Sequence, residues 1–428
     1  MIYDREIDNP LFIIRSSLNN LQTAIQSYKT PVLFVAKDIQ ENLTTEQKTV
    51  LQKSFLDRAN NLNRHINLVK NYLQTTTRLE DLSELQSKLQ NLHSHYLLSE
   101  RVLDYYMDVL HTRSELGMGI LLKGLDRLAY ESLKQGLEQI NKEEIPLAIC
   151  HLDAGIGAAI LSKGIQLWDY QANPAALIKI VRSSIATPKL TCVCHECGHQ
   201  FAKITGWNEE LARLIYKTII DSNFSRELAR YWAFWSSEIA ADFYCLSQCN
   251  FAAVVGLAEV LLAAAHRIYD YNEGDPHPIS WGRVMLGLTA CETILGNGPW
   301  TDYRKAWQTL FPLKRARGKS ANILAESLPL FEPLCKAIIN SHMECFNGKS
   351  LRDIIPWEKT SPKMIKNFLN DDLSEFSVSN ELYIKKPIVA LTCFRYIQMF
   401  GGRPHKWLED KMKDWLISLG SGGSELRI

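Results

Sequence analysis

The decapeptide TCVCHECGHQ, residues 191–200, constrains this chain more than any other segment. It contains His195, Glu196 and His199 in the order H-E-x-x-H. Residues four apart lie on one face of an α-helix, so both imidazoles can reach the same metal ion. Glu196 is rotated around the helix and can act on a water molecule without being a ligand. The alternative is a helix whose two histidines are solvated or packed in the core.

The residues around this motif predict the helix that carries it. Thr187 can cap a helix, Pro188 suits its first position, and Gly206 stands where the helix should end. Gly198, inside the motif, would let another element approach the helix closely because it has no side chain.

Short apolar segments bounded by polar residues precede this helix. Residues 145–152, 158–168 and 176–183 have the length and composition of β-strands. The rest of the chain has mostly helical periodicity. We therefore expect an α+β fold that is mostly α-helical, with a small sheet before the H-E-x-x-H helix.

A second motif, SSEIAAD, lies at residues 236–242 in a helix expected to start after a cap at Ser225. Glu238 and Asp242 are four residues apart and share a face of that helix. A zinc site with two histidines and an open position needs a third protein ligand, which Glu238 can supply. Asp242, one turn further on, could accept the outer N–H of a metal-bound imidazole, that of His195.

These two motifs resemble those of gluzincin-type zinc metallopeptidases, in which an H-E-x-x-H helix precedes a helix with a glutamate ligand, often as E-x-x-x-D. The resemblance implies one Zn²⁺ per chain, held by His195, His199 and Glu238. It also implies Glu196 as the general base and Asp242 as the residue that orients a ligand.

The same resemblance covers roughly residues 140–300 and implies a zincin-like catalytic core. In such cores a strand before the zinc helix usually lines the substrate cleft, and we expect residues 176–183 to be that strand. The segment DPHPISWGR, residues 275–283, also resembles sequences downstream of the glutamate ligand in some gluzincins. His277 or Arg283 could stabilise an oxyanion or hold a substrate carboxylate. Alternatively, His277 only caps a turn and Arg283 pairs with a carboxylate.

Cysteines surround the first motif, and at the positions of Cys192 and Cys194 gluzincins more often have apolar or threonine residues. Cys192, Cys194 and Cys197, together with Cys245 and Cys249, could bind a structural zinc ion. Their spacing is not the paired C-x-x-C of zinc ribbons, and cysteines one helical turn apart are typical of core packing. Both interpretations remain open at this stage.

The motifs divide the chain into a helical N-terminal region (1–120), a zincin-like metallopeptidase domain (121–312) and a helical C-terminal region (313–428). We expect a helical break at 370–380 and a flexible tail at 420–428. The N-terminal region contains two apolar stripes with helical spacing, the first after a cap at Thr44 or Thr45. The stripes predict a helical hairpin, which either packs on its own domain or forms a coiled-coil arm for a regulatory partner or a second copy.

Composition narrows the classes of function. The formal net charge of +1 gives no reason to expect binding to nucleic acid or an anionic membrane. The N-terminus does not have the pattern of a signal peptide, and the apolar run at 251–265 is too short to span a bilayer and contains Glu259. Ten scattered cysteines fit reduced thiols, so we expect a cytoplasmic protein.

The sequence thus predicts a zinc-dependent metallopeptidase, a hydrolase that acts on proteins or peptides and is regulated inside the cell. One alternative is a catalytically inactive, metallopeptidase-like helical protein that serves interaction or regulation and contains a structural zinc. Another keeps catalysis and lets the N-terminal helices bind a regulatory protein that controls access to the site.

Overall fold

The computed structural model describes residues 5–29, 37–115, 117–155, 157–187, 189–262, 264–368, 384–400 and 405–422. These residues are mostly helical and include a three-stranded sheet, which confirms the expected mostly helical α+β class. No helix among them is long and apolar enough to cross a membrane. The break expected at 370–380 and residues 423–428 of the expected tail lie outside the described residues.

The chain divides into two compact units. The first comprises Met1–Leu122 and Leu161–Ala176, and the second comprises Lys123–Ile160 and Leu177–Ile428. The first unit contains α1 (Arg5–Ile25), α2 (Lys37–Glu41), α3 (Thr45–Thr75) and α4 (Leu82–His111). Helix α5 (Met118–Leu137) begins in the first unit and ends in the second.

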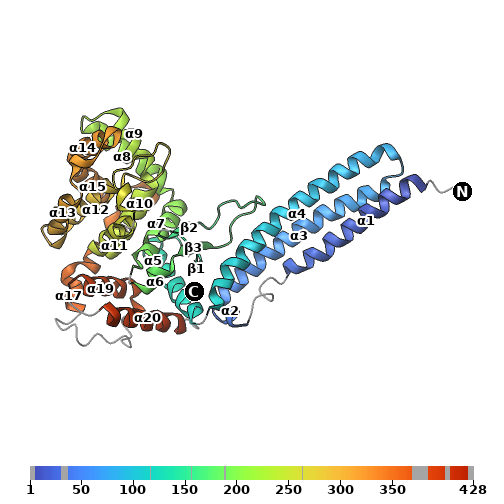
Figure 1. Cartoon of the computed structure of the whole chain (residues 1–428), viewed down its shortest axis with the longest axis horizontal. Helices are drawn as coiled ribbons and strands as arrows, with labels where there is room; N and C mark the ends of the chain where they lie inside the picture. Colours follow the sequence, from blue (N-terminus) through green and yellow to red (C-terminus); the bar gives the residue numbers. More distant parts are fainter. Residues whose placement is uncertain are drawn as a thin grey trace. The chain divides into compact units, whose positions relative to one another are not determined.

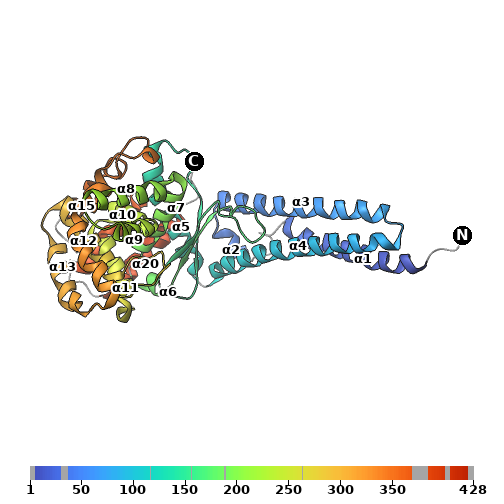
Figure 2. The ribbon, with the colours of Figure 1, turned by 90° about the horizontal axis from the view of Figure 1, so that it is seen from above.

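The first unit is built on a bundle in which α1, α3 and α4 lie side by side (Figure 1 and Figure 2). Thr44 caps α3 through a reciprocal pair of hydrogen bonds with Gln47, as its position before the apolar stripe predicted. The predicted helical hairpin is therefore confirmed as α3 and α4. All residues of the first predicted stripe are buried: Leu51, Phe55, Ala59, Leu62, Ile66, Val69 and Leu73.

A buried ion pair joins α3 to residues 161–176, which belong to the same unit. The Arg58 Nε lies 2.7 Å from the Asp169 Oδ2, and the two side chains are only 1% and 3% exposed. Nearby, the Tyr106 hydroxyl donates to Asn173, whose amide donates to three backbone carbonyls. This segment is thus held by buried polar contacts as well as by apolar packing.

The sheet consists of β1 (Ala148–Leu152), β2 (Ala159–Leu161) and β3 (Ala176–Ile180) in the order β1-β3-β2. All of its residues except Leu161 and Ala176 belong to the second unit. All three strands lie within the segments predicted from sequence. Helix α6 (Arg182–Ala186) follows β3. The helices that then carry or surround the two motifs are α7 (Thr191–Thr205), α8 (Trp207–Asp221), α9 (Arg226–Phe234), α10 (Ser236–Cys249), α11 (Phe251–Leu262) and α12 (Ser280–Leu295).

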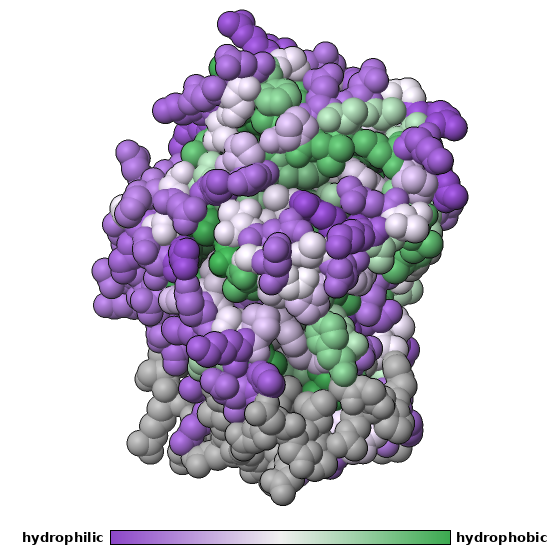
Figure 3. Space-filling model, turned by 90° about the vertical axis from the view of Figure 1, so that its left-hand side faces the viewer, coloured by the Kyte–Doolittle hydropathy of each residue, from purple (hydrophilic) through white to green (hydrophobic). Residues whose placement is uncertain are grey.

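The remaining helices of the second unit follow in chain order. They are α13 (Pro299–Leu310), α14 (Gly318–Ser327), α15 (Phe331–Asn340), α16 (Leu351–Ile354), α17 (Pro362–Phe368), α19 (Pro387–Phe400) and α20 (His405–Ser421). Figure 3 shows one face of the molecule, on which hydrophilic side chains predominate and hydrophobic ones gather in a band across its upper half.

The helix expected to run on from Ser225 is in fact two helices, α9 and α10. Ser225 caps α9 as predicted, but the chain leaves helical geometry at Trp235, where ψ is 7°. The Trp235 indole is buried and packs against the rings of Tyr231, Trp232 and Tyr271. Helical periodicity missed this break because both halves have helical patterns and only the tertiary packing of Trp235 distinguishes them.

The buried ion pair gives a prediction for the first unit. Asp169→Asn should lower its free energy of unfolding by about 3–5 kcal/mol, because it leaves the Arg58 charge buried without its counter-ion. The double variant Arg58→Met, Asp169→Leu should recover most of that loss. Urea unfolding, with hydrogen exchange of α3 and α4 as the local probe, measures both effects. An unchanged unfolding midpoint for Asp169→Asn would contradict the prediction.

A candidate metal centre between two helices

The first motif lies on α7, a helix of about four turns. The helix ends at Gly206, whose φ of 80° is in the left-handed region that glycine favours, and this confirms the predicted C-terminus. Its first residue is Thr191, further along the chain than a cap at Thr187 implies, and Pro188 lies outside the described residues. His195, Glu196 and His199 are therefore all in regular helix.

The second motif reaches the first because α7 and α10 approach closely at Gly198. A Cβ atom at this position would lie 2.7 Å from the Cα of Ala241 and 3.0 Å from the Cβ of Tyr244. No real side chain fits at such distances, so the absence of one at Gly198 sets the separation of the two helices. The close approach predicted for this glycine is confirmed.

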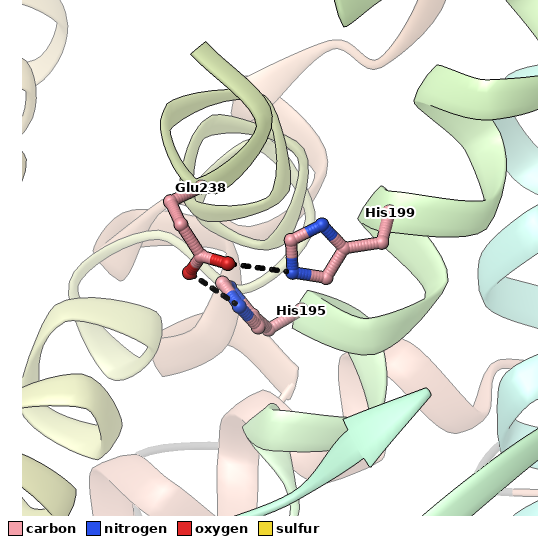
Figure 4. Close-up of side chains that lie close together, drawn as sticks. All are labelled: His195, His199 and Glu238. Carbon is pink, nitrogen blue, oxygen red and sulfur yellow. Dashed lines mark ion pairs between the residues drawn. The ribbon is translucent and has the colours of Figure 1, made fainter. Parts of the chain in front are cut away.

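The close packing brings together His195 and His199 of α7 and Glu238 of α10 (Figure 4). The Glu238 carboxylate points between the two imidazoles, with Oε1 3.3 Å from His199 Nε2 and Oε2 3.6 Å from His195 Nε2. One ligand atom from each residue lies within 4.8 Å of the others, a grouping that could hold a metal ion.

The donors of this group are of a kind that zinc binds. Two imidazole nitrogens and one carboxylate oxygen are ligands that zinc binds at about 2.0–2.1 Å in a tetrahedral arrangement. Two ligand atoms of such a tetrahedron are roughly 3.3 Å apart, by the geometry of those bond lengths. His199 Nε2 lies at this distance from Glu238 Oε1, whereas His195 Nε2 is 3.6 Å from the other oxygen, Oε2.

The outer nitrogen of each imidazole has a partner that fixes the orientation of its ring. His195 Nδ1 lies 3.0 Å from Asp242 Oδ1, the contact predicted for this aspartate. His199 Nδ1 lies 3.3 Å from the Ser237 hydroxyl. Burial acts to lower the pKa of His195, but its hydrogen bonds to Asp242 and Glu238 raise that pKa to about 10. Ser237 was missed, although its place beside Glu238 in the motif offered a signal.

Arg283, on α12, compensates the charges of the two carboxylates of α10. Its Nε and Nη2 bind Asp242 at 2.5 and 2.8 Å, and the same Nη2 lies 2.8 Å from the Glu238 Oε2. Burial acts to raise the pKa of both carboxyls, yet the charge of Arg283 and the hydrogen bonds of the histidines hold them below their usual values. The sequence alternative in which Arg283 pairs with a carboxylate is thus observed.

Glu196 lies beside the metal-binding group without belonging to it. Its side chain lines the same cavity and is only 5% exposed. Burial raises its pKa, although the nearby His195 and His199 oppose this effect. A buried carboxyl with a raised pKa is suited to accept a proton and then release it.

His277, in contrast, is 57% exposed at the edge of the site. Its Nε2 lies 3.6 Å from Glu238 Oε1, while its Nδ1 lies 2.7 Å from Asp275 Oδ1. The Asp275 carboxylate also accepts the backbone N–H of His277, which holds the turn and orients the ring. The structure therefore brings His277 to the site, and Asp275, two residues earlier, is a partner that the sequence analysis did not name.

The histidines, carboxylates and arginine of this site line a cavity of about 590 Å³ within the second unit. Its wall includes Ala159 and Ile160 of β2 but no residue of β3. The expectation that residues 176–183 line the cleft is therefore wrong. β3 is the central strand, and the strand that borders the cavity is β2, one of the two edge strands.

The cysteines near the motif have other contacts. Cys192 donates to the carbonyl of Lys189, and Cys245 donates to that of Thr191. Cys194 and Cys249 contact each other, with their sulfur atoms 3.9 Å apart. Within the described part of the chain, the group with metal-ligand geometry contains two histidines and a glutamate and no cysteine.

Comparison with known proteins does not indicate a function for this chain. The chain matches no protein-family model, no curated protein and no solved structure. Its function must therefore be argued from the site itself.

The helix contact at Gly198 gives a second prediction. Gly198→Ala should lower the free energy of unfolding by about 1–3 kcal/mol, since the added methyl group meets backbone atoms of Ala241 that cannot move without separating α7 from α10. The same variant should bind zinc more weakly, because Glu238 moves away from the histidines. Chemical denaturation and zinc titration measure the two effects, with Lys203→Ala on the exposed face of α7 as the control.

Proposed function

We propose that this protein is a zinc-dependent metallopeptidase, with one Zn²⁺ bound by His195, His199 and Glu238. One observation carries the proposal: a buried glutamate, Glu196, shares a cavity with a group of zinc-type ligands. That combination is what water-dependent hydrolysis requires. The gluzincin resemblance assigns the same roles to the same residues.

Each residue then has a part in hydrolysis of a peptide bond. A zinc ion bound here would supply a Lewis acid that lowers the pKa of a water molecule and polarises a peptide carbonyl. Glu196 accepts the proton of the attacking water and passes it to the leaving amine. Asp242 holds the His195 ring, and Arg283 holds Asp242 and Glu238 in place.

Substrate contacts fall to the residues at the edge of the site. His277, oriented by Asp275 and exposed to the cavity, can donate a hydrogen bond to a developing oxyanion. β2, at the edge of the sheet, can pair with an extended peptide. Arg283 is engaged with two carboxylates, so its role in substrate binding requires one of these contacts to open.

The alternative, an inactive protein with a structural zinc, would need a fourth protein ligand to close the site. Among the described residues, the metal-type group has three members, and it opens to a cavity that can admit a ligand. These features favour the catalytic function. We place the enzyme in the cytoplasm, because none of the ten cysteines forms a disulfide bond, and propose that the N-terminal helices bind a protein that regulates it.

Metal analysis is the first test. We expect one zinc per chain in the purified protein, and its loss in the double variant His195→Ala, Glu238→Ala. Asp242→Asn should weaken zinc binding by about 10- to 100-fold, because His195 loses its orienting partner. Zinc retained by the double variant would assign the metal to the cysteines and contradict the proposal.

The role of Glu196 has a separate test. The Glu196→Gln variant should keep its zinc. Its hydrolytic activity should fall on the order of 100- to 10,000-fold, since glutamine cannot accept the proton. Cleavage of a mixed peptide library, followed by mass spectrometry, measures the loss. Glu209→Gln, at an exposed position of α8, is the matched control. Full activity in a zinc-loaded Glu196→Gln protein would show that Glu196 is not the base.

A further inference from the structure

One wall of the cavity is apolar and comes largely from α11. The residues of this helix that line the cavity follow helical spacing: Ala253, Val254, Gly256, Leu257, Val260 and Leu261. Leu257, Val260 and Leu261 are only partly buried, whereas most other apolar residues of α11 are in the core. Large apolar side chains on a concave surface are typical of ligand pockets.

The charged residue of α11 is turned away from this wall. Glu259 does not line the cavity, and its carboxylate lies 3.0 Å from the buried guanidinium of Arg395 on α19. The ion pair fixes the rotation of α11, so that the apolar stripe faces the cavity. A charged substrate side chain placed against the stripe would lose its hydration and gain no partner from α11.

The apolar wall continues onto the segment that enters β2. A Cβ atom at Gly157 would lie 3.3 Å from the Val260 Cγ1, so the backbone there passes close to α11. Ala158, Ala159 and Ile160 extend the lining from this point. A peptide that pairs with the edge of β2 would therefore have the α11 stripe within reach of its side chains.

We propose that this wall is the specificity pocket of the site and binds a large apolar side chain of the substrate: leucine, isoleucine, methionine or phenylalanine. The inference rests on the proposed function in that it names the class of peptide the site accepts. Each methylene buried on the wall should improve binding by roughly 4-fold, the equivalent of about 0.8 kcal/mol. Leucine should accordingly be preferred to alanine by at least about 10-fold.

Binding to the Glu196→Gln variant tests the pocket without requiring hydrolysis. The probes are dye-labelled hexapeptides of alanine and glycine with one variable residue, either leucine, phenylalanine, alanine or glutamate. Fluorescence anisotropy measures their affinity for the full-length, zinc-loaded protein, or for the protein as purified if it takes up no zinc. We expect the leucine and phenylalanine peptides to bind at least about 10-fold more tightly than the alanine and glutamate peptides.

Variants on α11 assign the preference to the wall. In the Glu196→Gln background, Val260→Trp should fill the pocket and reduce the leucine-to-alanine ratio to near one. Leu261→Ala removes volume from a partly exposed position and should reduce the leucine-to-alanine ratio several-fold. It is less disruptive to folding than Val260→Trp, because it introduces no bulky side chain. Leu262→Trp is the control, because Leu262 is on the same helix, 38% exposed, and does not line the cavity.

The outcomes separate the two proposals. Equal affinities for all peptides, no binding of any peptide, or a preference that Val260→Trp and Leu261→Ala leave unchanged would each overturn the specificity pocket. A leucine preference that both variants reduce and Leu262→Trp keeps would support it. If that preference holds while the zinc-loaded native chain cleaves no peptide, the pocket stands and the peptidase function fails.

Discussion

The site depends on the burial of two neighbouring carboxylates beside one guanidinium. Glu238 and Asp242 are one turn apart on α10, and their mutual repulsion in a poorly solvated position would be costly without a cation. Arg283 supplies it from α12, with both Asp242 oxygens and one Glu238 oxygen in its reach. A bidentate contact also fixes direction, so α12 is held in register with α10.

The same interaction sets the orientation of His195. Asp242, held by Arg283, is the partner of His195 Nδ1, which leaves Nε2 directed toward Glu238. The orientation of His195 on α7 thus depends on a residue of α12, whereas Ser237 of α10 holds the ring of His199. Such a site is preorganised, because protein contacts hold its polar groups in position.

Spacing rules recovered the parts of this site that are local in sequence. The i, i+4 pairs His195–His199 and Glu238–Asp242 share helix faces whatever the tertiary fold, and glycine at 206 ends a helix by its own backbone preference. The order of the strands could not be predicted in this way, because the sequences of residues 159–161 and 176–180 do not indicate which strand lies at the edge of the sheet. The break at Trp235 and the contact of Asp169 with Arg58 also depend on residues distant in sequence.

The apolar run at 251–265 shows a related limit. A cavity wall and a protein core both require apolar side chains at helical spacing, so the pattern alone cannot distinguish them. The position of Glu259 is informative only once its partner, Arg395, is known. An ion pair behind a helix can thus reveal which face of the helix is open.

The lack of space for a side chain at Gly198 restricts which residues related chains can have at this position. A methyl group at 198 meets the backbone of Ala241, so no change of side-chain conformation nearby can make room for it. Chains that share this arrangement should therefore read H-E-x-G-H rather than H-E-x-x-H. They should also have a small residue opposite, where Ala241 stands here. Such a steric signature could identify distant relatives even where overall sequence similarity has disappeared.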